Sequence, residues 1–449
     1  MASTSNNLKD DTKSNLTKKI TVRTPMVITK EALDSILQHQ NLIEHFQSSL
    51  PIVFPTISSP MRQSHVVQPH SSLLLMPSWS SSPSLPYIGV KLVTHFPQNS
   101  AINLPAIHAS YSLFSSTTGQ TLGSMDGTAL TLYRTSCISG LAAKYLARPD
   151  SRVMVMVGAG ALGPHLIKAH LAVRPSVKKV IIWNRTEERA KRLADEMREN
   201  AGLDGVCFES SANLDDAISV ADIVSCATNS EVPLVKGDKL KCGAYLNLVG
   251  SFKPSMRECD DMAIKRGRVF VDCEEALEEA GELLGALERG VIEKSDILGL
   301  VDLIKGQIVG RRNEDEISVF KSVGSAMFDL VAAQFAIRKP WYVRSEDVSS
   351  AIRLPSEATN NDGDVDLCPV SVPSSCPVKC FRTDPVCGVD GVTYWCGCAD
   401  ALCSGVKVAK MGFCEVGNGG SASIPGQALL LVHILWLIIL GVSVLFGLF

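Results

Sequence analysis

The stretch "VMVMVGAGALGPHL", Val153–Leu166, joins an apolar run to three spaced glycines and then to a helix-like segment. The pattern G-x-G-x-x-G is also typical of an ordinary tight strand-to-helix connection, but a strand before it and a helix after it make it informative. Gly158 would permit the tight turn, Gly160 would let backbone approach a pyrophosphate, and Gly163 would let the helix pack closely. The amides at the helix start would face phosphate. We therefore predict a dinucleotide-binding turn made of Gly158, Ala159, Gly160, Ala161, Leu162 and Gly163.

The end of the next predicted strand bears on which dinucleotide is bound. It reads Asn184-Arg185-Thr186, where an NAD site usually carries a carboxylate for the ribose hydroxyls. These three side chains could instead donate hydrogen bonds to a 2′-phosphate, and Arg185 adds positive charge. The pattern favours NADPH over NADH, which stays possible; the alternative is that Arg185 is only a solvated residue at a helix start.

From Arg152 onward, strand-like and helix-like segments alternate. This alternation indicates an α/β fold with a parallel, doubly wound sheet of the Rossmann type. Before it, a helix at 29–50 and strand-like runs at 72–77, 87–96 and 106–116 indicate a second α/β region, which leads into a helix at about 128–146. The later strands are expected at 152–157, 177–184, 221–228, 244–250 and 268–272, with helices such as 186–200 between them and a final helix at 316–337.

Several motifs carry a family resemblance. In chain order they are "PMRQSH", "GVKLVTHFPQN", "TGQTLGSMDGTALTLYRTSCISGLAAKYLA", "VGAGALG", "WNRT", "LVGSFKPSMRECD" and "DEISVFKSVGSAMFDL". Over about residues 25–340 the chain resembles the ornithine cyclodeaminase/μ-crystallin family, and within it the plant ketimine reductases that complete pipecolate synthesis. The resemblance implies a homodimer with a small-molecule cyclic imino acid as substrate. It also implies a Rossmann domain at 131–311 and a substrate-binding and dimerisation domain at 26–130, completed by 312–340.

The resemblance also assigns site residues. Arg62, Lys91 and Arg134 match the positions of a clamp for the substrate carboxylate, Lys91 and Arg134 also as catalytic residues, and Thr135 is a further donor. The residues themselves agree, because a cation in an apolar strand such as that of Lys91 is costly unless an anion meets it. The alternative is surface charges with buried stems. The nicotinamide side of the cleft is expected to be lined by Ala227, Thr228, Asn229, Val249 and Gly250.

One position departs from the cyclodeaminases. They carry an Asp shortly after the strand that matches "YLNLVG", where this chain has Phe252. Ornithine cyclodeamination needs groups that handle protons, and Phe252 cannot do so. A protonated cyclic ketimine is already activated, so positioning and electrostatics could supply most of the acceleration. We therefore expect NADPH-dependent reduction of a ketimine carboxylate, best Δ1-piperideine-2-carboxylate to pipecolate. The alternatives are a cyclodeaminase-type lyase and a non-catalytic μ-crystallin-like binding protein.

The cysteines divide the chain. Six of fourteen are scattered before residue 340 and eight crowd between Cys368 and Cys414, which predicts a disulfide framework. The alternative is a zinc site, which is disfavoured because the spacings do not form two clean C-x-x-C pairs, so we predict no metal. "PVCGVDGVTYWCGC" in this module, 368–416, resembles the Kazal-type protease inhibitors. If the module is inhibitory, the resemblance implies an inhibitor loop with Arg382 and a serine protease as partner; the alternative is a module that is only stapled by disulfides. The sequence leaves the disulfide connectivity open. A net charge of −3 gives no reason to expect nucleic acid as a partner.

Different parts of the chain indicate different cellular locations. Residues 1–25 have no apolar core and read as a flexible segment or possible plastid transit segment. Residues 341–367 read as a polar linker, and 428–449 as a single-pass membrane helix or a lipid-anchor signal. A reductase belongs in the plastid or cytosol, whereas a disulfide module belongs outside the cell. The simplest explanation is that two coding units were joined; a tail-anchored enzyme is the alternative.

Overall fold

A computed structural model describes residues 25–338 apart from 103 and 201, together with Cys376, residues 385–412 and Cys414. The chain divides into two compact units, 1–341 and 342–449. The predicted transit segment, linker and tail at 428–449 lie outside the described residues, as does Arg382.

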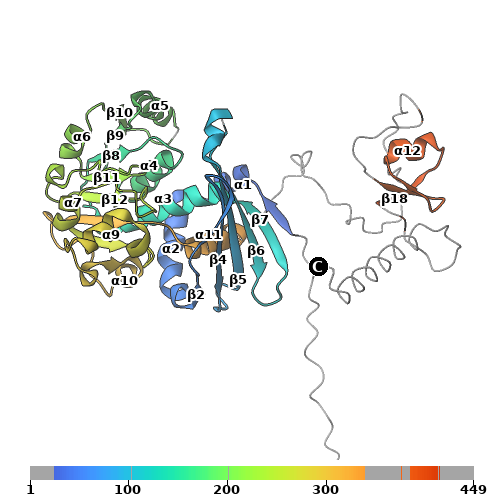
Figure 1. Ribbon diagram of the computed structural model, residues 1–449, viewed down its shortest axis with the longest axis horizontal. Helices are drawn as coiled ribbons and strands as arrows, with labels where there is room; N and C mark the ends of the chain where they lie inside the picture. Colours follow the sequence, from blue (N-terminus) through green and yellow to red (C-terminus); the bar gives the residue numbers. More distant parts are fainter. Residues whose placement is uncertain are drawn as a thin grey trace, which may run out of the picture. The chain divides into compact units, whose positions relative to one another are not determined.

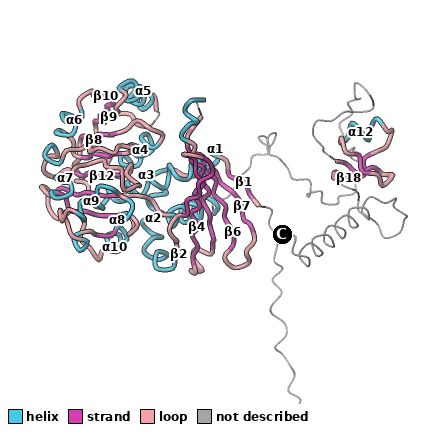
Figure 2. Tube along the Cα trace, viewed as in Figure 1, coloured by secondary structure: helices cyan, strands magenta, loops and turns pink. Residues whose placement is uncertain are grey.

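Among the described residues, seven strands form the first sheet of the first unit, in the order β1-β7-β6-β5-β4-β2, with β3 paired to β4. All neighbours are antiparallel except β1 and β7. Figure 2 shows these long strands side by side. They are β1 (Met26–Ile28), β2 (Ile57–Ser58), β3 (Gln63–Gln68), β4 (Ser71–Ser80), β5 (Tyr87–His95), β6 (Ile107–Ser115) and β7 (Thr121–Asp126).

Helices pack on one face of this sheet. The longest is α3 (Gly127–Leu146), which begins where the Asp126 side chain accepts a hydrogen bond from the Ala129 amide at 2.7 Å. It packs against β6 and α11 (Ala326–Arg338), and α11 packs against β4 and β5. The predicted helix at 29–50 is in fact α1 (Lys30–Ile36) and α2 (His39–Val53), followed by the 3₁₀ turn η1 (Phe54–Thr56); η2 (Pro97–Ile102) follows β5.

The second sheet is the predicted parallel one. Its strand order is β10-β9-β8-β11-β12-β15-β13-β14, and every described pairing is parallel. The strands are β8 (Val153–Val157), β9 (Lys179–Trp183), β10 (Cys207–Ser210), β11 (Ile223–Cys226), β12 (Tyr245–Leu248), β13 (Gly267–Val271), β14 (Leu298–Gly299) and β15 (Ile317–Lys321).

Helices cover both faces of the parallel sheet (Figure 1). Met154 and Met156 of β8 point into the core under α4 and α5, whereas Val155 and Val157 point into the core under α6, α7 and α9. Burial on both sides explains why these strands read as continuous apolar runs. The helices are α4 (Leu162–Val173), α5 (Glu187–Arg198), α6 (Leu214–Val220), α7 (Asp261–Arg266), α8 (Ala276–Glu279), α9 (Gly281–Glu288) and α10 (Leu300–Ile304), with 3₁₀ turns η3 (Gly237–Lys239) and η4 (Lys294–Asp296).

Two sequence interpretations were wrong at this level. The segment 316–337 was expected to be one helix, but its first part is β15, a fully buried strand between β12 and β13. Its apolar run before Gly324 reads equally well as a helix or a buried strand, and only the neighbouring strands decide between them. Likewise β7 lies at residues that were not among the predicted strands.

The second unit holds a small antiparallel sheet of order β17-β16-β18 and one short helix. Two disulfides are described, Cys376–Cys403 and Cys387–Cys414, a pairing that the sequence left open. The elements are β16 (Val386–Gly388), β17 (Thr393–Tyr394), α12 (Cys398–Cys403) and β18 (Val408–Met411).

The expectation of a single-pass membrane attachment is corrected. No helix within the described ranges combines the length and the apolar character that crossing a bilayer requires. The longest of them, α3 with 20 residues, carries Arg134, Lys144 and several hydroxyl side chains. Residues 428–449, on which the expectation rested, are not among those described.

Candidate functional site

The glycine turn lies at the carboxyl end of β8, where the strand order reverses. β9 flanks β8 on one side and β11 on the other, and this switch point is where open parallel sheets bind ligands. Gly158 has a φ of +108°, and a Cβ there would lie 2.6 Å from the carbonyl oxygen of Ala227. A Cβ on Gly160 would meet nothing within 4 Å, so the backbone at Gly160 is open to approach. At Gly163 it would lie 3.1 Å from the Gly158 oxygen, in the close strand-to-helix packing that was predicted.

The residues predicted to select NADPH lie beside this turn. The Asn184 side-chain oxygen accepts a hydrogen bond from the Ala159 amide at 3.1 Å, and its amide nitrogen donates to the Thr186 carbonyl at 2.9 Å. Asn184 therefore ties the end of β9 to the turn after β8. Arg185 and Thr186 are exposed at the start of α5. Ala161 and Leu162 begin α4 next to them.

The loops after β11 and β12 are joined by a carboxylate that the sequence interpretation missed. Glu258 is fully buried and accepts hydrogen bonds from the Thr228 amide at 2.7 Å, the Thr228 hydroxyl at 2.9 Å and the Gly250 amide at 2.7 Å. Burial raises the pKa of Glu258. This contact brings Thr228 and Gly250 together at the same sheet edge, with Ala227 and Val249 beside them and Asn229 exposed.

Two of the three predicted cations meet at one buried carboxylate. Lys91 of β5 and Arg134 of α3 contact Asp329 of α11, with Nζ–Oδ2 at 2.7 Å and Nε–Oδ1 at 2.9 Å. Their side chains are 3%, 5% and 0% exposed. Burial, followed by the neighbouring Arg134, lowers the pKa of Lys91 to about 8 against the opposing pull of Asp329. Burial opposes ionisation of Asp329, but the two cations outweigh it and hold its pKa below the usual value.

Asp329 could have been found from the sequence. It interrupts the apolar segment "AMFDLVAAQFAI", and a buried carboxylate is as costly without a partner as a buried lysine. The cost of burying an unpaired charge therefore indicates a partner for Asp329 as it does for Lys91.

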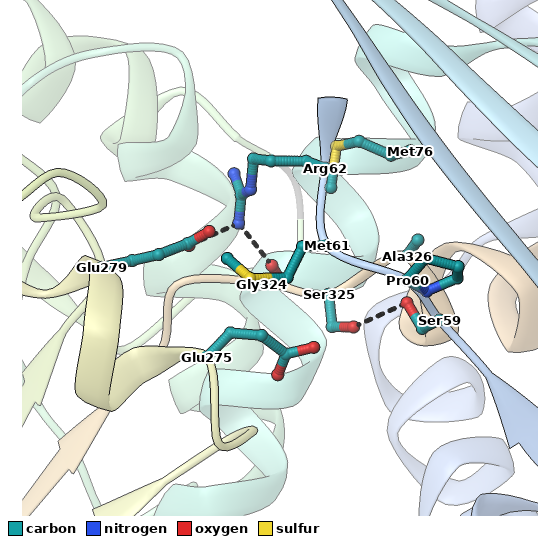
Figure 3. Close-up of a pocket in the computed structure, with 10 residues that line it drawn as sticks. All are labelled: Ser59, Pro60, Met61, Arg62, Met76, Glu275, Glu279, Gly324, Ser325 and Ala326. Carbon is teal, nitrogen blue, oxygen red and sulfur yellow. Dashed lines mark hydrogen bonds and ion pairs between the residues drawn. The ribbon is translucent and has the colours of Figure 1, made fainter. Parts of the chain in front are cut away.

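The third predicted cation, Arg62, lies between β2 and β3 and reaches toward the other sheet. Its Nη2 contacts Glu279 Oε2 at 2.7 Å and donates to the Gly324 carbonyl at 3.1 Å. Figure 3 shows Arg62 and Glu279 pointing toward one another from different elements, with Glu275 alongside. Glu279 ends α8, which follows strand β13 of the parallel sheet. The Arg62–Glu279 ion pair thus joins the segments of the two sheets.

The connection from β15 to α11 brings the three cations together. Gly324 has a φ of +74°, and a Cβ there would lie 2.2 Å from Nη1 of Arg134. Buried Asp272 holds this turn by accepting from the Ser322 hydroxyl at 2.7 Å and the Gly324 amide at 2.9 Å. One short turn therefore contacts both arginines, and Asp329 follows it in the chain.

The remaining predicted positions are less closely tied to this cluster. Thr135 is buried in α3, and none of the described contacts of the three cations involves it. Phe252 is half-buried, with the Lys253 ammonium 5.8 Å from its ring centroid. The hydroxyl of Ser251, just before it, donates to the Met256 carbonyl at 2.7 Å and accepts from the Gly281 amide.

Together these features define a Rossmann-type protein with a glycine turn at the switch point of its parallel sheet and three cations gathered near the turn before α11. The chain belongs to the ornithine cyclodeaminase/mu-crystallin family, whose sequence pattern matches residues 23–341.

Two relatives illustrate the similarity. Protein SAR DEFICIENT 4 from Arabidopsis thaliana is 60% identical over 311 residues, which are 69% of this chain and 96% of that protein. A Delta(1)-pyrroline-2-carboxylate reductase from Colwellia psychrerythraea is 36% identical over 313 residues, or 67% of this chain and 96% of the reductase.

Solved structures show the same fold. The Thermococcus litoralis Delta(1)-pyrroline-2-carboxylate reductase in complex with NADH and L-proline matches with a TM-score of 0.65 and 31% identity. The match covers 70% of this chain and 96% of that one. An archaeal alanine dehydrogenase dimer with bound NAD matches with a TM-score of 0.63 and 26% identity, covering 70% and 95%.

Proposed function

We propose that this chain reduces cyclic ketimine carboxylates with NADPH, and that its substrate is Δ1-piperideine-2-carboxylate, which gives pipecolate. The broader assignment, an imine oxidoreductase that uses a nicotinamide dinucleotide, is the activity of the similar reductase from Thermococcus litoralis, solved with NADH and L-proline. Proline and pipecolate differ only in ring size, and both place a carboxylate next to a ring nitrogen.

The observation that carries the proposal is the charge balance of the buried cluster. Lys91 and Arg134 bring two positive charges, and Asp329 brings one negative charge. A buried site with an excess positive charge favours a ligand that carries one negative charge. A substrate with a single carboxylate meets this requirement, and Arg62 beside Gly324 supplies a further donor.

Reduction of a protonated ketimine requires mainly that the protein place the ring carbon against the cofactor. NADPH bound at the glycine turn would supply a hydride to the ring carbon of the protonated C=N bond, whose electron pair passes to nitrogen and leaves a secondary amine. Lys91 and Arg134 would fix the carboxylate, and thereby the ring carbon, relative to the turn after β8. Phe252 stands where the cyclodeaminases carry an acidic group, and a phenyl ring cannot move protons. These residues therefore support reduction rather than cyclodeamination.

The direct test follows NADPH absorbance in purified full-length protein with Δ1-piperideine-2-carboxylate and, in parallel, Δ1-pyrroline-2-carboxylate. We expect turnover of both, with the larger kcat/KM for the six-membered ring. Ammonia release from ornithine without ketimine turnover would contradict the proposal. Tight ligand binding without turnover of either ring would favour a binding protein.

The preference for NADPH is tested separately through Arg185→Asp. A carboxylate at this exposed position would repel a 2′-phosphate and could accept hydrogen bonds from a ribose hydroxyl, so preference should shift toward NADH. The ratio of kcat/KM for the two cofactors is the measurement, and Arg189→Asp on the same helix is the control. An unchanged ratio would place the phosphate contact elsewhere.

We also propose a homodimer that buries the uncovered face of the first sheet. Strand pairing aligns Pro77, Val90, Ser112, Ser124 and Val27 across this face. On the same face, Trp79 is 41% and Leu92 37% exposed, and Val27 is 77% exposed. The similar alanine dehydrogenase forms a dimer. Sedimentation velocity should show a dimer that Leu92→Glu dissociates; a wild-type monomer would contradict this.

A further inference from the structure

We propose that Glu279 competes with the substrate carboxylate for Arg62 and thereby sets the affinity of the site. This inference rests on the proposed function, because it assumes that Arg62 receives the carboxylate of a cyclic imino acid. The competitor is a carboxylate of the protein itself, Glu279, at the end of the helix that follows strand β13 of the parallel sheet.

The geometry shows that Glu279 makes the contact expected of a ligand. Its Oε2 lies 2.7 Å from Nη2 of Arg62, which is the distance of a charge-assisted hydrogen bond. The same Nη2 donates to the Gly324 carbonyl, so this nitrogen has no further hydrogen to offer a substrate. A substrate carboxylate can bind this edge of the guanidinium only by replacing Glu279.

The small volume of the cavity beside Arg62 also indicates that a substrate carboxylate must replace Glu279. The cavity bounded by Arg62, Glu275, Glu279, Gly324 and Met76 has a volume of about 10 Å³, room for about one water molecule. A carboxylate attached to a ring does not fit there while Glu279 keeps its place. Figure 3 shows the Glu279 carboxylate between its own helix and the guanidinium of Arg62.

The ion pair is also of the kind that can open. The Arg62 and Glu279 side chains are 22% and 13% exposed, so each can be hydrated when the pair separates. The Lys91–Asp329–Arg134 cluster has almost no exposure, so separating its charges costs more than separating Arg62 from Glu279. Glu279 is therefore the exchangeable anion of the site and Asp329 the permanent one. Burial raises the pKa of Glu279 against the effect of Arg62, which is consistent with a contact of modest strength.

The test uses Glu279→Gln in the full-length chain, with Glu288→Gln as the matched control. Glu288 is exposed at the end of α9 and does not line the cavity beside Arg62. Binding of L-pipecolate in saturating NADP⁺ is measured by calorimetry, and KM and kcat are measured with Δ1-piperideine-2-carboxylate. Removing the competing charge should lower both the dissociation constant and KM roughly three- to tenfold. We expect kcat and NADPH affinity to stay within about twofold, and Glu288→Gln to change none of these values.

Two further variants make the result decisive. Glu279→Ala, which also removes the competing charge, should behave like Glu279→Gln and covers the case in which Glu279→Gln fails to fold. In Arg62→Ala/Glu279→Gln the gain in affinity should vanish. Unchanged or weaker pipecolate binding in both Glu279 variants would overturn the inference, and so would an absence of pipecolate binding in all of them. Tighter binding without ketimine turnover would uphold it while refuting the proposed function.

Discussion

Two groups of charges near the same turn, a cluster of three residues and a pair, differ in their access to water. Asp329 with Lys91 and Arg134 lies inside the core between β5, α3 and α11, whereas Glu279 with Arg62 lies at the edge of a small cavity. Distances are alike, at 2.7–2.9 Å. What differs is the cost of separation, because a buried charge without a partner cannot be solvated.

The carboxylates of Asp329 and Glu279 make similar contacts but have different roles. The buried carboxylate cannot leave, so it fixes two cations in place and keeps one excess positive charge. The carboxylate at the edge can be exchanged for a substrate. A count of salt bridges would treat both alike, whereas their burial separates a structural anion from a competing one.

The largest effect is expected from Asp329→Asn. This change leaves Lys91 and Arg134 buried without a counter-charge, which costs about 3–5 kcal/mol of folding free energy. Urea unfolding of the full chain should show a lower midpoint, and ketimine reduction should be lost. Glu279→Gln is the comparison, with a loss below about 1 kcal/mol because its ion pair is partly exposed. Equal losses in the two variants would remove the distinction between the pairs.

A smaller effect is expected from removing the cations. Arg62→Ala or Lys91→Ala should weaken binding of the substrate carboxylate roughly ten- to a hundredfold, as expected for a charge-assisted pair worth about 1.5–3 kcal/mol. NADPH affinity should stay unchanged. Arg192→Ala removes an arginine whose side chain is 70% exposed and serves as the control. If KM and kcat are unchanged in both variants, the carboxylate clamp is assigned wrongly.

The smallest expected effect is a pH dependence of opposite direction for folding stability and for carboxylate binding. Lys91 has a pKa of about 8 in the folded protein against 10.5 ordinarily, so between these values the unfolded chain binds more protons. The contribution of Lys91 to the free energy of unfolding therefore rises with pH across this window. Carboxylate binding should instead weaken above pH 8, because the site loses a positive charge.

A ring carboxylate without a titrating nitrogen, tetrahydropyran-2-carboxylate, isolates this effect. Its dissociation constant in wild type should increase about two- to tenfold as pH rises through 8, while Lys91→Arg should show a flat profile because guanidinium stays protonated. The same inflection in Lys91→Arg would assign it to another group.

Much of the fold follows from local sequence patterns. The apolar run before Gly158, the three glycines and the helix after them predicted a strand, a tight turn and a helix in a parallel sheet, and these elements are present. The strand at 317–321 was misread as part of a helix because its place between β12 and β13 depends on residues distant in the chain. Periodicity reports only on neighbours in sequence, so it cannot decide such cases.

The sequence by itself also determined which residue types the site contains. A lysine in an apolar strand favoured an anion as its partner, and the motif order pointed to the family. Only the tertiary structure decided which anions they meet. Asp329 lies 238 residues after Lys91, and Glu279 lies 217 residues after Arg62. No local pattern connects such distant charges, because their attraction depends on separation in space and on exclusion of water, and folding alone sets both.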